Sequence, residues 1–194
     1  RGPSAYSNCY VLSDVLGFTL EWDLDAAAGL LHVSISAAVL PAGGYVAFGF
    51  RPLGRYGPAD GHPDLPPSLG TGTAAKFGMR GADIVLGHAG GVETRYASDF
   101  VGTPALDSSL AVTNASTAVA GDGRVTVSFT RPLIGGKLKA AYNVNASIVS
   151  PEADVLWAVG AMGGGAPSYH GHARGLRFVD WKTPQAAMAS FTCS

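Results

Sequence analysis

The chain has 194 residues, of which 47% are hydrophobic, enough to bury a sizeable core. Only 14% are charged, and 13 Lys and Arg nearly balance 14 Asp and Glu, so nucleic acid is excluded as an expected partner. We find no apolar run near the ~18 residues that a membrane-spanning helix needs. We interpret residues 1–194 as a single domain.

Hydrophobic and polar residues alternate along the first part of the chain, which is the pattern of half-buried strands. Residues 18–25 and 31–39 show this period and flank a turn at 25–29, so we expect an antiparallel hairpin. Residues 45–50 predict a third, more uniformly apolar strand. Residues 51–75 are rich in Gly, Pro, Asp and Ser and predict a long loop, a kind of segment that often covers a functional site.

The rest of the chain repeats short strands and turns. We predict further strands at residues 82–86, 92–97, 110–119, 124–130, 154–161 and 176–181, and one or two helical turns at 183–191. Eight or nine short strands with closely spaced turns are typical of an all-β protein. The fold we expect is an antiparallel, immunoglobulin-like β-sandwich.

The two cysteines and two glycosylation patterns predict an oxidising compartment. A disulfide between Cys9 and Cys193 would close a long loop and constrain the unfolded chain by roughly 4–5 kcal/mol. Asn114 and Asn145 each begin an Asn-Ala-Ser acceptor sequence. We therefore expect a protein that is secreted or lies on the extracellular side of the plasma membrane. The alternative is two unpaired thiols, one near each end of the chain.

The sequence has few side chains arranged for catalysis. It contains no Gly-x-Ser-x-Gly elbow, no phosphate-binding loop and no His-Glu-x-x-His, so we expect no enzymatic activity of its own. Two elements remain, Met79 ahead of the strand at 82–86 and the pair His170 and His172 ahead of the last strand. A thioether and an imidazole are the neutral ligands that together hold haem iron in electron carriers.

Six segments in this order give the chain a resemblance to the DOMON family, of the type that binds haem b. They are residues 44–50 (GYVAFGF), 79–87 (MRGADIVLG), 92–96 (VETRY), 129–133 (FTRPL), 156–160 (LWAVG) and 169–175 (YHGHARG). The resemblance implies one non-covalent b-type haem with Met79 and His170 as axial ligands. His172 is the alternative ligand, since in an extended segment it shares a face with His170.

The surroundings of such a haem follow from its chemistry. We expect an apolar slot between the two sheets, lined by Tyr45, Phe48, Ile84 and Trp157. The propionates need cations at the rim, and the candidates near the ligands are Arg80, Arg174 and Lys76.

Two protein ligands leave no open position on the iron, so we expect single-electron transfer in an extracellular redox chain. The candidate donors and acceptors are a flavin domain, a transmembrane b-type cytochrome and an ascorbate-like reductant. The alternative is a haem-free DOMON module that binds a protein partner or carbohydrate, with sugar rings stacked on tyrosines such as Tyr45, Tyr56, Tyr96 or Tyr169. A third reading is a copper site of His170, His172 and Met79.

Overall fold

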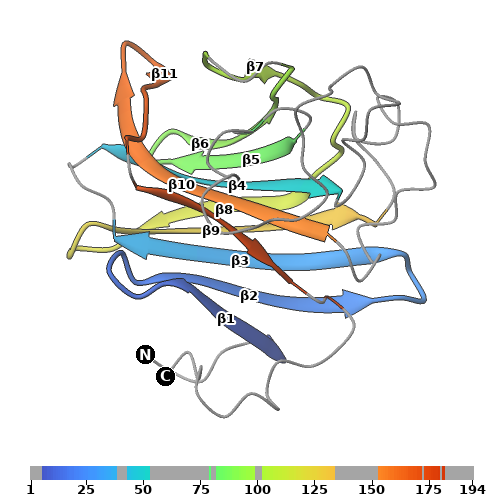
Figure 1. Cartoon of the computed structure of the whole chain (residues 1–194). Coiled ribbons are helices and arrows are strands. Elements are labelled where there is room, and N and C mark those ends of the chain that lie inside the picture. Colours follow the sequence, from blue (N-terminus) through green and yellow to red (C-terminus); the bar gives the residue numbers. More distant parts are fainter. Residues whose placement is uncertain are drawn as a thin grey trace, which may run out of the picture.

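The chain folds into two antiparallel β-sheets that pack face to face (Figure 1). The structure is a computed structural model that describes residues 6–38, 43–52, 79, 82–98, 102–133, 153–171, 173–179 and 181. All the regular secondary structure within these ranges is β-strand, which confirms the expected all-β, antiparallel sandwich.

The first sheet has five strands in the order β1-β2-β3-β9-β8. They span Asn8–Ser13 (β1), Phe18–Asp25 (β2), Leu30–Ala38 (β3), Arg124–Pro132 (β9) and Thr113–Val119 (β8). The β2–β3 hairpin closes as predicted, with Gly29 at a positive φ of 67° and the Ala28 amide donating to the Asp25 carboxylate at 2.9 Å. The two edge strands are irregular, because the pairing register shifts once in β1 and once in β8.

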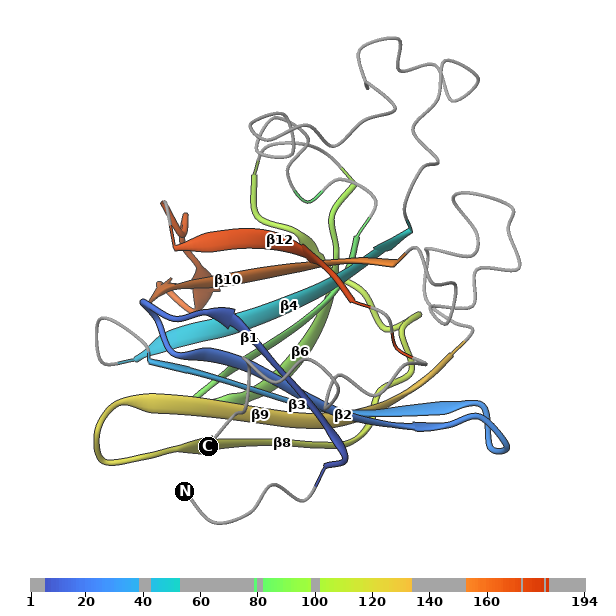
Figure 2. The same cartoon turned by 60° about the horizontal axis from the view of Figure 1, so that its bottom comes forward.

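The second sheet has seven strands and carries the cavity discussed below. Its order is β11-β10-β4-β5-β6-β7, and β12 also pairs with β10. The strands are Ala166–Pro167 (β11), Ala153–Gly163 (β10), Gly44–Pro52 (β4), Asp83–His88 (β5), Gly91–Tyr96 (β6), Ala105–Leu106 (β7) and Arg174–Phe178 (β12). Figure 2 shows β12, β10 and β4 in one layer and β9 and β8 in the other.

The main core lies between the two sheets and is rich in aromatic rings. Its largest buried side chains include Trp22, Trp181, Phe48, Phe50 and Phe129. The Trp22 and Trp181 rings meet edge to face with centroids 5.4 Å apart, and the Trp22 indole also donates to the Trp181 carbonyl at 3.3 Å. Edge-to-face contacts of this kind add stability beyond the burial of apolar area.

A second buried cluster covers the outer face of the seven-stranded sheet. Side chains alternate along β4, so Phe48 and Phe50 belong to the main core while Tyr45 and Ala47 belong to this second cluster. The other members are Ala82, Ile84, Leu86, Ala97 and Ala158. Strand β4 is therefore buried on both faces, which explains its uniformly apolar sequence.

Most predicted strands are confirmed, with shifted ends. The strand expected at 110–119 begins only at Thr113, because Leu110 is buried in the core and its carbonyl accepts from the Val112 amide in a turn. The last strand begins earlier, at Arg174, and ends at Phe178. Strands β1, β7 and β11 were not predicted. The expected loop at 51–75 loses residues 51 and 52 to β4, and the rest of it, with the tail at 183–191, lies outside the described residues.

Candidate functional site

The outer face of the seven-stranded sheet forms an apolar floor with small side chains at its centre. Ala47 of β4 lies opposite Leu86 of β5 on one side and opposite Ala158 of β10 on the other. Gly49 continues the row along β4, and a side chain added there would press on Ile84 at 3.3 Å. Small residues on β4 and β10 thus leave space above the middle of the sheet.

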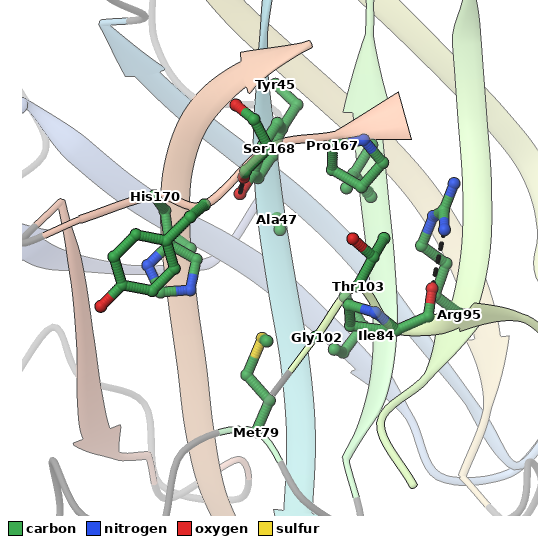
Figure 3. A pocket seen from close by; sticks show the side chains of 14 residues that line it. Tyr45, Ala47, Met79, Ile84, Arg95, Gly102, Thr103, Pro167, Ser168 and His170 are labelled. Atoms are coloured by element: carbon green, nitrogen blue, oxygen red, sulfur yellow. Dashed lines mark hydrogen bonds between the residues drawn. The ribbon is translucent and has the colours of Figure 1, made fainter. Parts of the chain in front are cut away.

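A cavity of about 200 Å³ lies above this floor (Figure 3). Its walls come from strands β4, β5, β6, β10 and β11, and from the segments before β5, before β7 and after β11. The lining residues are Tyr45, Ala47, Met79, Ile84, Leu86, Arg95, Gly102, Thr103, Pro104, Ala158, Pro167, Ser168, Tyr169 and His170. The cavity is therefore mostly apolar, with a thioether, an imidazole and a guanidinium at its walls.

Met79 reaches the cavity from the segment before β5. Its carbonyl accepts a hydrogen bond of 2.9 Å from the Ala82 amide, and Ala82 in turn accepts from Ala97, so this segment is tied to the sheet. The side chain packs against the second buried cluster. In Figure 3 its sulfur points into the space below His170.

His170 reaches the same cavity from the turn between β11 and β12. Its carbonyl accepts from the Ala173 amide at 3.0 Å, and Gly171 has the positive φ of 57° that this tight turn requires. Its ring lies against that of Tyr169, with centroids 5.1 Å apart and an angle of 31° between the rings. The Tyr169 ring is itself 76% exposed.

The imidazole of His170 is held neutral and incompletely hydrogen-bonded. Burial lowers its pKa below the ordinary value of 6.5, the positive charge of Arg174 lowers it further, and a hydrogen bond with the Gly171 backbone opposes these effects. Its Nδ1 atom is buried without a hydrogen-bond partner. A neutral imidazole with an unpartnered nitrogen is suited to bind a metal ion.

Tyr45 connects the floor to the turn that carries His170. Its hydroxyl donates to the carbonyl oxygen of Ser168 at 3.0 Å, and Ser168 donates to the Ala161 carbonyl through both its amide and its hydroxyl. The Tyr45 ring lies over Gly160, where an added Cβ would approach ring atoms to 2.7 Å. Burial raises the pKa of Tyr45 to about 12, so the hydroxyl keeps its proton.

Arg95 is a cavity residue that the sequence interpretation missed. Strand β6 carries it to the same face as Ile84, its partner on β5. Its Nε and Nη2 atoms lie 2.8 and 2.6 Å from Glu93 Oε2, and its Nη1 donates to the Pro104 carbonyl at 2.7 Å. The alternation in residues 92–97 could have placed Arg95 and Glu93 on one face of the strand. It could not have predicted that a cavity lies over that face.

The structure brings some of the predicted site residues to the cavity and places others elsewhere. Met79, His170, Tyr45 and Ile84 all line the cavity. Phe48 and Trp157 do not, because they point from the other face of the sheet into the main core, where Trp157 contacts Phe18 at 5.3 Å between ring centroids. The expected slot between the sheets is thus wrong, since that space is filled by core side chains and the cavity lies on the outer face.

Arg174 lies near the cavity without lining it. It is exposed, and its guanidinium carbon is 5.6 Å from the centre of the Tyr169 ring. Arg80, Lys76 and His172 lie outside the described residues, so their predicted roles stay predictions.

Of the residues predicted to mark the compartment, the structure describes Cys9 and Asn114, and neither lines the cavity. Cys9 is on β1 and is not a free cysteine, while Cys193 lies outside the described residues, so their pairing stays a prediction. Asn114 is exposed on β8 with a positive φ of 51°, and Asn145 is outside the described ranges.

The described ranges hold neither a cluster of metal-binding side chains nor a membrane-spanning helix. No group of three or more His, Cys, Asp or Glu side chains there could hold a metal ion. Nor is any helix in that part of the chain long and apolar enough to cross a membrane.

Comparison with known proteins relates the fold to cytochrome domains. No family model and no curated protein matches the chain. The cytochrome domain of Myriococcum thermophilum cellobiose dehydrogenase matches with a TM-score of 0.51 and 14% identity, over 91% of this chain and 85% of that one. The cytochrome b domain of pyranose dehydrogenase from Coprinopsis cinerea matches with a TM-score of 0.52 and 12% identity, over 93% and 86%. At such identities the likeness establishes a shared β-sandwich fold alone.

Proposed function

We propose that the protein binds one b-type haem non-covalently in the outer-face cavity, with Met79 and His170 as axial ligands, and carries single electrons. The observation that carries this proposal is the convergence of these two side chains, from segments far apart in the sequence, on one apolar cavity. The fold shared with cytochrome b domains supports it.

The residues around the cavity fit a haem in two respects, while the volume is small. The floor of alanines and leucine offers an apolar surface for a planar ring. The lowered pKa keeps His170 in the neutral form that binds iron, and its Nδ1 is buried without a partner. The volume of about 200 Å³ is below the ~300–1,000 Å³ usual for sites that bury a whole small molecule. The described residues would therefore enclose a haem only in part.

The chemistry at this site is electron transfer. A bound haem supplies a one-electron iron couple. Met79 and His170 would occupy both axial positions and leave none for oxygen or peroxide, and a thioether ligand favours the reduced iron. The chain itself then contributes ligation, an apolar surface and limited access of water, which is the work of an electron carrier within a larger redox chain.

The test is haem reconstitution with matched variants. We expect the wild-type protein to give a sharp, low-spin ferrous spectrum after dithionite, and Met79→Ala and His170→Ala each to lose it. Met162→Ala and His32→Ala are the controls, because Met162 packs beside the second cluster without lining the cavity and His32 lies on β3, bonded to Thr130.

Two results would count against the proposal. A protein that stays colourless with haem present would contradict it and leave the carbohydrate-binding alternative, for which Tyr169 offers an exposed ring. A spectrum that survives both Met79→Ala and His170→Ala would show that haem binds elsewhere.

We further propose that this carrier works outside the cell, with a flavin domain, a membrane cytochrome or an ascorbate-like reductant as partner. The exposed Asn114 within an Asn-Ala-Ser sequence and the absence of a free thiol at Cys9 are compatible with that compartment. Mass spectrometry of peptides from the secreted, non-reduced protein should find a Cys9–Cys193 cross-link, and two reduced thiols would contradict it.

A further inference from the structure

The cavity contains one permanently charged side chain among the residues described around it, that of Arg95. Arg95 as a whole is only 7% exposed. A buried cation is costly unless its donors are satisfied, so a charged group kept at the wall of an apolar cavity needs an explanation.

Its contacts hold the Arg95 guanidinium in place but do not occupy all of its N–H donors. Glu93 receives bonds from Nε and Nη2, and the Pro104 carbonyl receives one from Nη1. An arginine has five N–H donors, so these contacts leave one hydrogen on each terminal nitrogen without a partner among the described residues. A carboxylate can accept hydrogen bonds from such N–H groups.

The ion pair with Glu93 still leaves Arg95 able to bind a second carboxylate. Its side chain is 24% exposed, and its other oxygen, Oε1, lies 3.4 Å from His88 Nε2. Glu93 therefore meets both solvent and a second partner, while Arg95 faces the cavity. Thr103 lies beside Arg95 at the same wall, across the cavity from His170 (Figure 3).

We propose that Arg95 binds a carboxylate of the ligand in this cavity, and that a haem lies there with a propionate directed toward β6 and away from Arg174. The inference rests on the proposed haem binding. Arg174, one of the three cations expected for this task from the sequence, is exposed and lies 5.6 Å from the centre of the Tyr169 ring.

The experiment compares haem b with its dimethyl ester, in which both carboxylates are blocked. Dissociation constants are measured by absorbance titration of the wild-type protein, of Arg95→Met, and of Arg177→Met as control, since Arg177 is exposed on β12 and does not line the cavity. We expect the wild-type protein and the control to bind the free acid about tenfold or more tightly than the ester. In Arg95→Met the two compounds should bind alike.

A second variant tests whether a change in binding by Arg95→Met comes from misfolding. Arg95→Met leaves Glu93 without its main partner, so Arg95→Met combined with Glu93→Gln removes both charges and should give the same loss of discrimination. If the preference for the free acid survives in these variants, the role of Arg95 is overturned while haem binding stands. If the wild-type protein binds neither compound, the proposed function fails, and this inference fails with it.

Discussion

The hydroxyl group of Tyr45 donates a hydrogen bond of 3.0 Å to the carbonyl oxygen of Ser168, two residues before His170. The bond joins the central strand of the sheet to the turn that carries the histidine. Because the Tyr45 ring also lies over Gly160, the same side chain forms part of the floor and braces the turn. The position of His170 therefore depends on a hydrogen bond made by a side chain of another strand.

Tyr45→Phe should loosen this turn while keeping the ring. We expect a loss of about 1 kcal/mol in the free energy of unfolding, measured by urea denaturation of the haem-free protein, and weaker haem binding by absorbance titration. Tyr169→Phe is the control, because its ring is exposed at the same turn. Equal stability of Tyr45→Phe and wild type would show that the bond does not hold the turn.

The titration of His170 should be shifted downward in the haem-free protein. Its pKa is lowered by burial and then by Arg174, so NMR of its imidazole should give a midpoint below 6.5. Unfolded chains take up this proton at the ordinary pKa. Stability should therefore fall as the pH drops through 6.5, because the unfolded state binds the proton first.

Arg174→Gln tests the electrostatic part of this shift. Removing the positive charge should raise the pKa of His170, whereas Arg177→Gln should leave it unchanged, since Arg177 is not among the groups that shift it. A midpoint that stays the same in Arg174→Gln would assign the whole shift to burial.

Arg131 and Asp83 should behave as a coupled pair in the main core. Arg131 is fully buried, its guanidinium lies 4.2 Å from the centre of the Phe50 ring, and burial lowers its pKa to about 10 while the charge of Asp83 raises it. Arg131→Met leaves the buried Asp83 carboxylate without this opposing charge, and should cost about 1–3 kcal/mol of stability.

Adding Asp83→Asn to Arg131→Met removes the remaining charge and should recover part of that loss. Urea denaturation of both single variants and the double variant gives the coupling energy. Strictly additive losses would show that the two side chains stabilise the fold independently.

Gly87 should be intolerant of any side chain. It lies on the inner face of β5, where an added Cβ would overlap the Val127 side chain of the facing sheet. Gly87→Ala should destabilise the protein by about 1–3 kcal/mol through overpacking. Gly121→Ala is the control, because nothing lies within 4 Å of that added Cβ. Similar unfolding midpoints for the two variants would argue against a tight sheet spacing here.

The sequence predicted the strands better than it predicted which way their side chains point. Alternation is clear in β2, whose outer face meets water, and there the predicted bounds equal the observed ones. Strand β4 is buried on both faces, so its sequence could not tell that Phe48 faces the core and Tyr45 the cavity. The errors in placing Phe48 and Trp157 follow from this ambiguity, because β10, which carries Trp157, is also apolar on both faces.

Met79 and His170 were proposed as ligands from their residue types and from the family resemblance, which need no knowledge of sheet packing. Neither of these indications pointed to Arg95. Its importance comes from the segment before β7 folding over β6 and supplying the Pro104 carbonyl, a contact between strands that periodicity does not encode.

The irregular edges of the five-stranded sheet affect how this protein meets other copies of itself. A regular edge strand offers a row of unpaired amides and carbonyls on which another chain can assemble. In β1 and β8 the register shift interrupts that row, and in β8 it coincides with the left-handed backbone of Asn114. At high concentration the five-stranded sheet should therefore resist edge-to-edge growth into fibrils through β1 or β8.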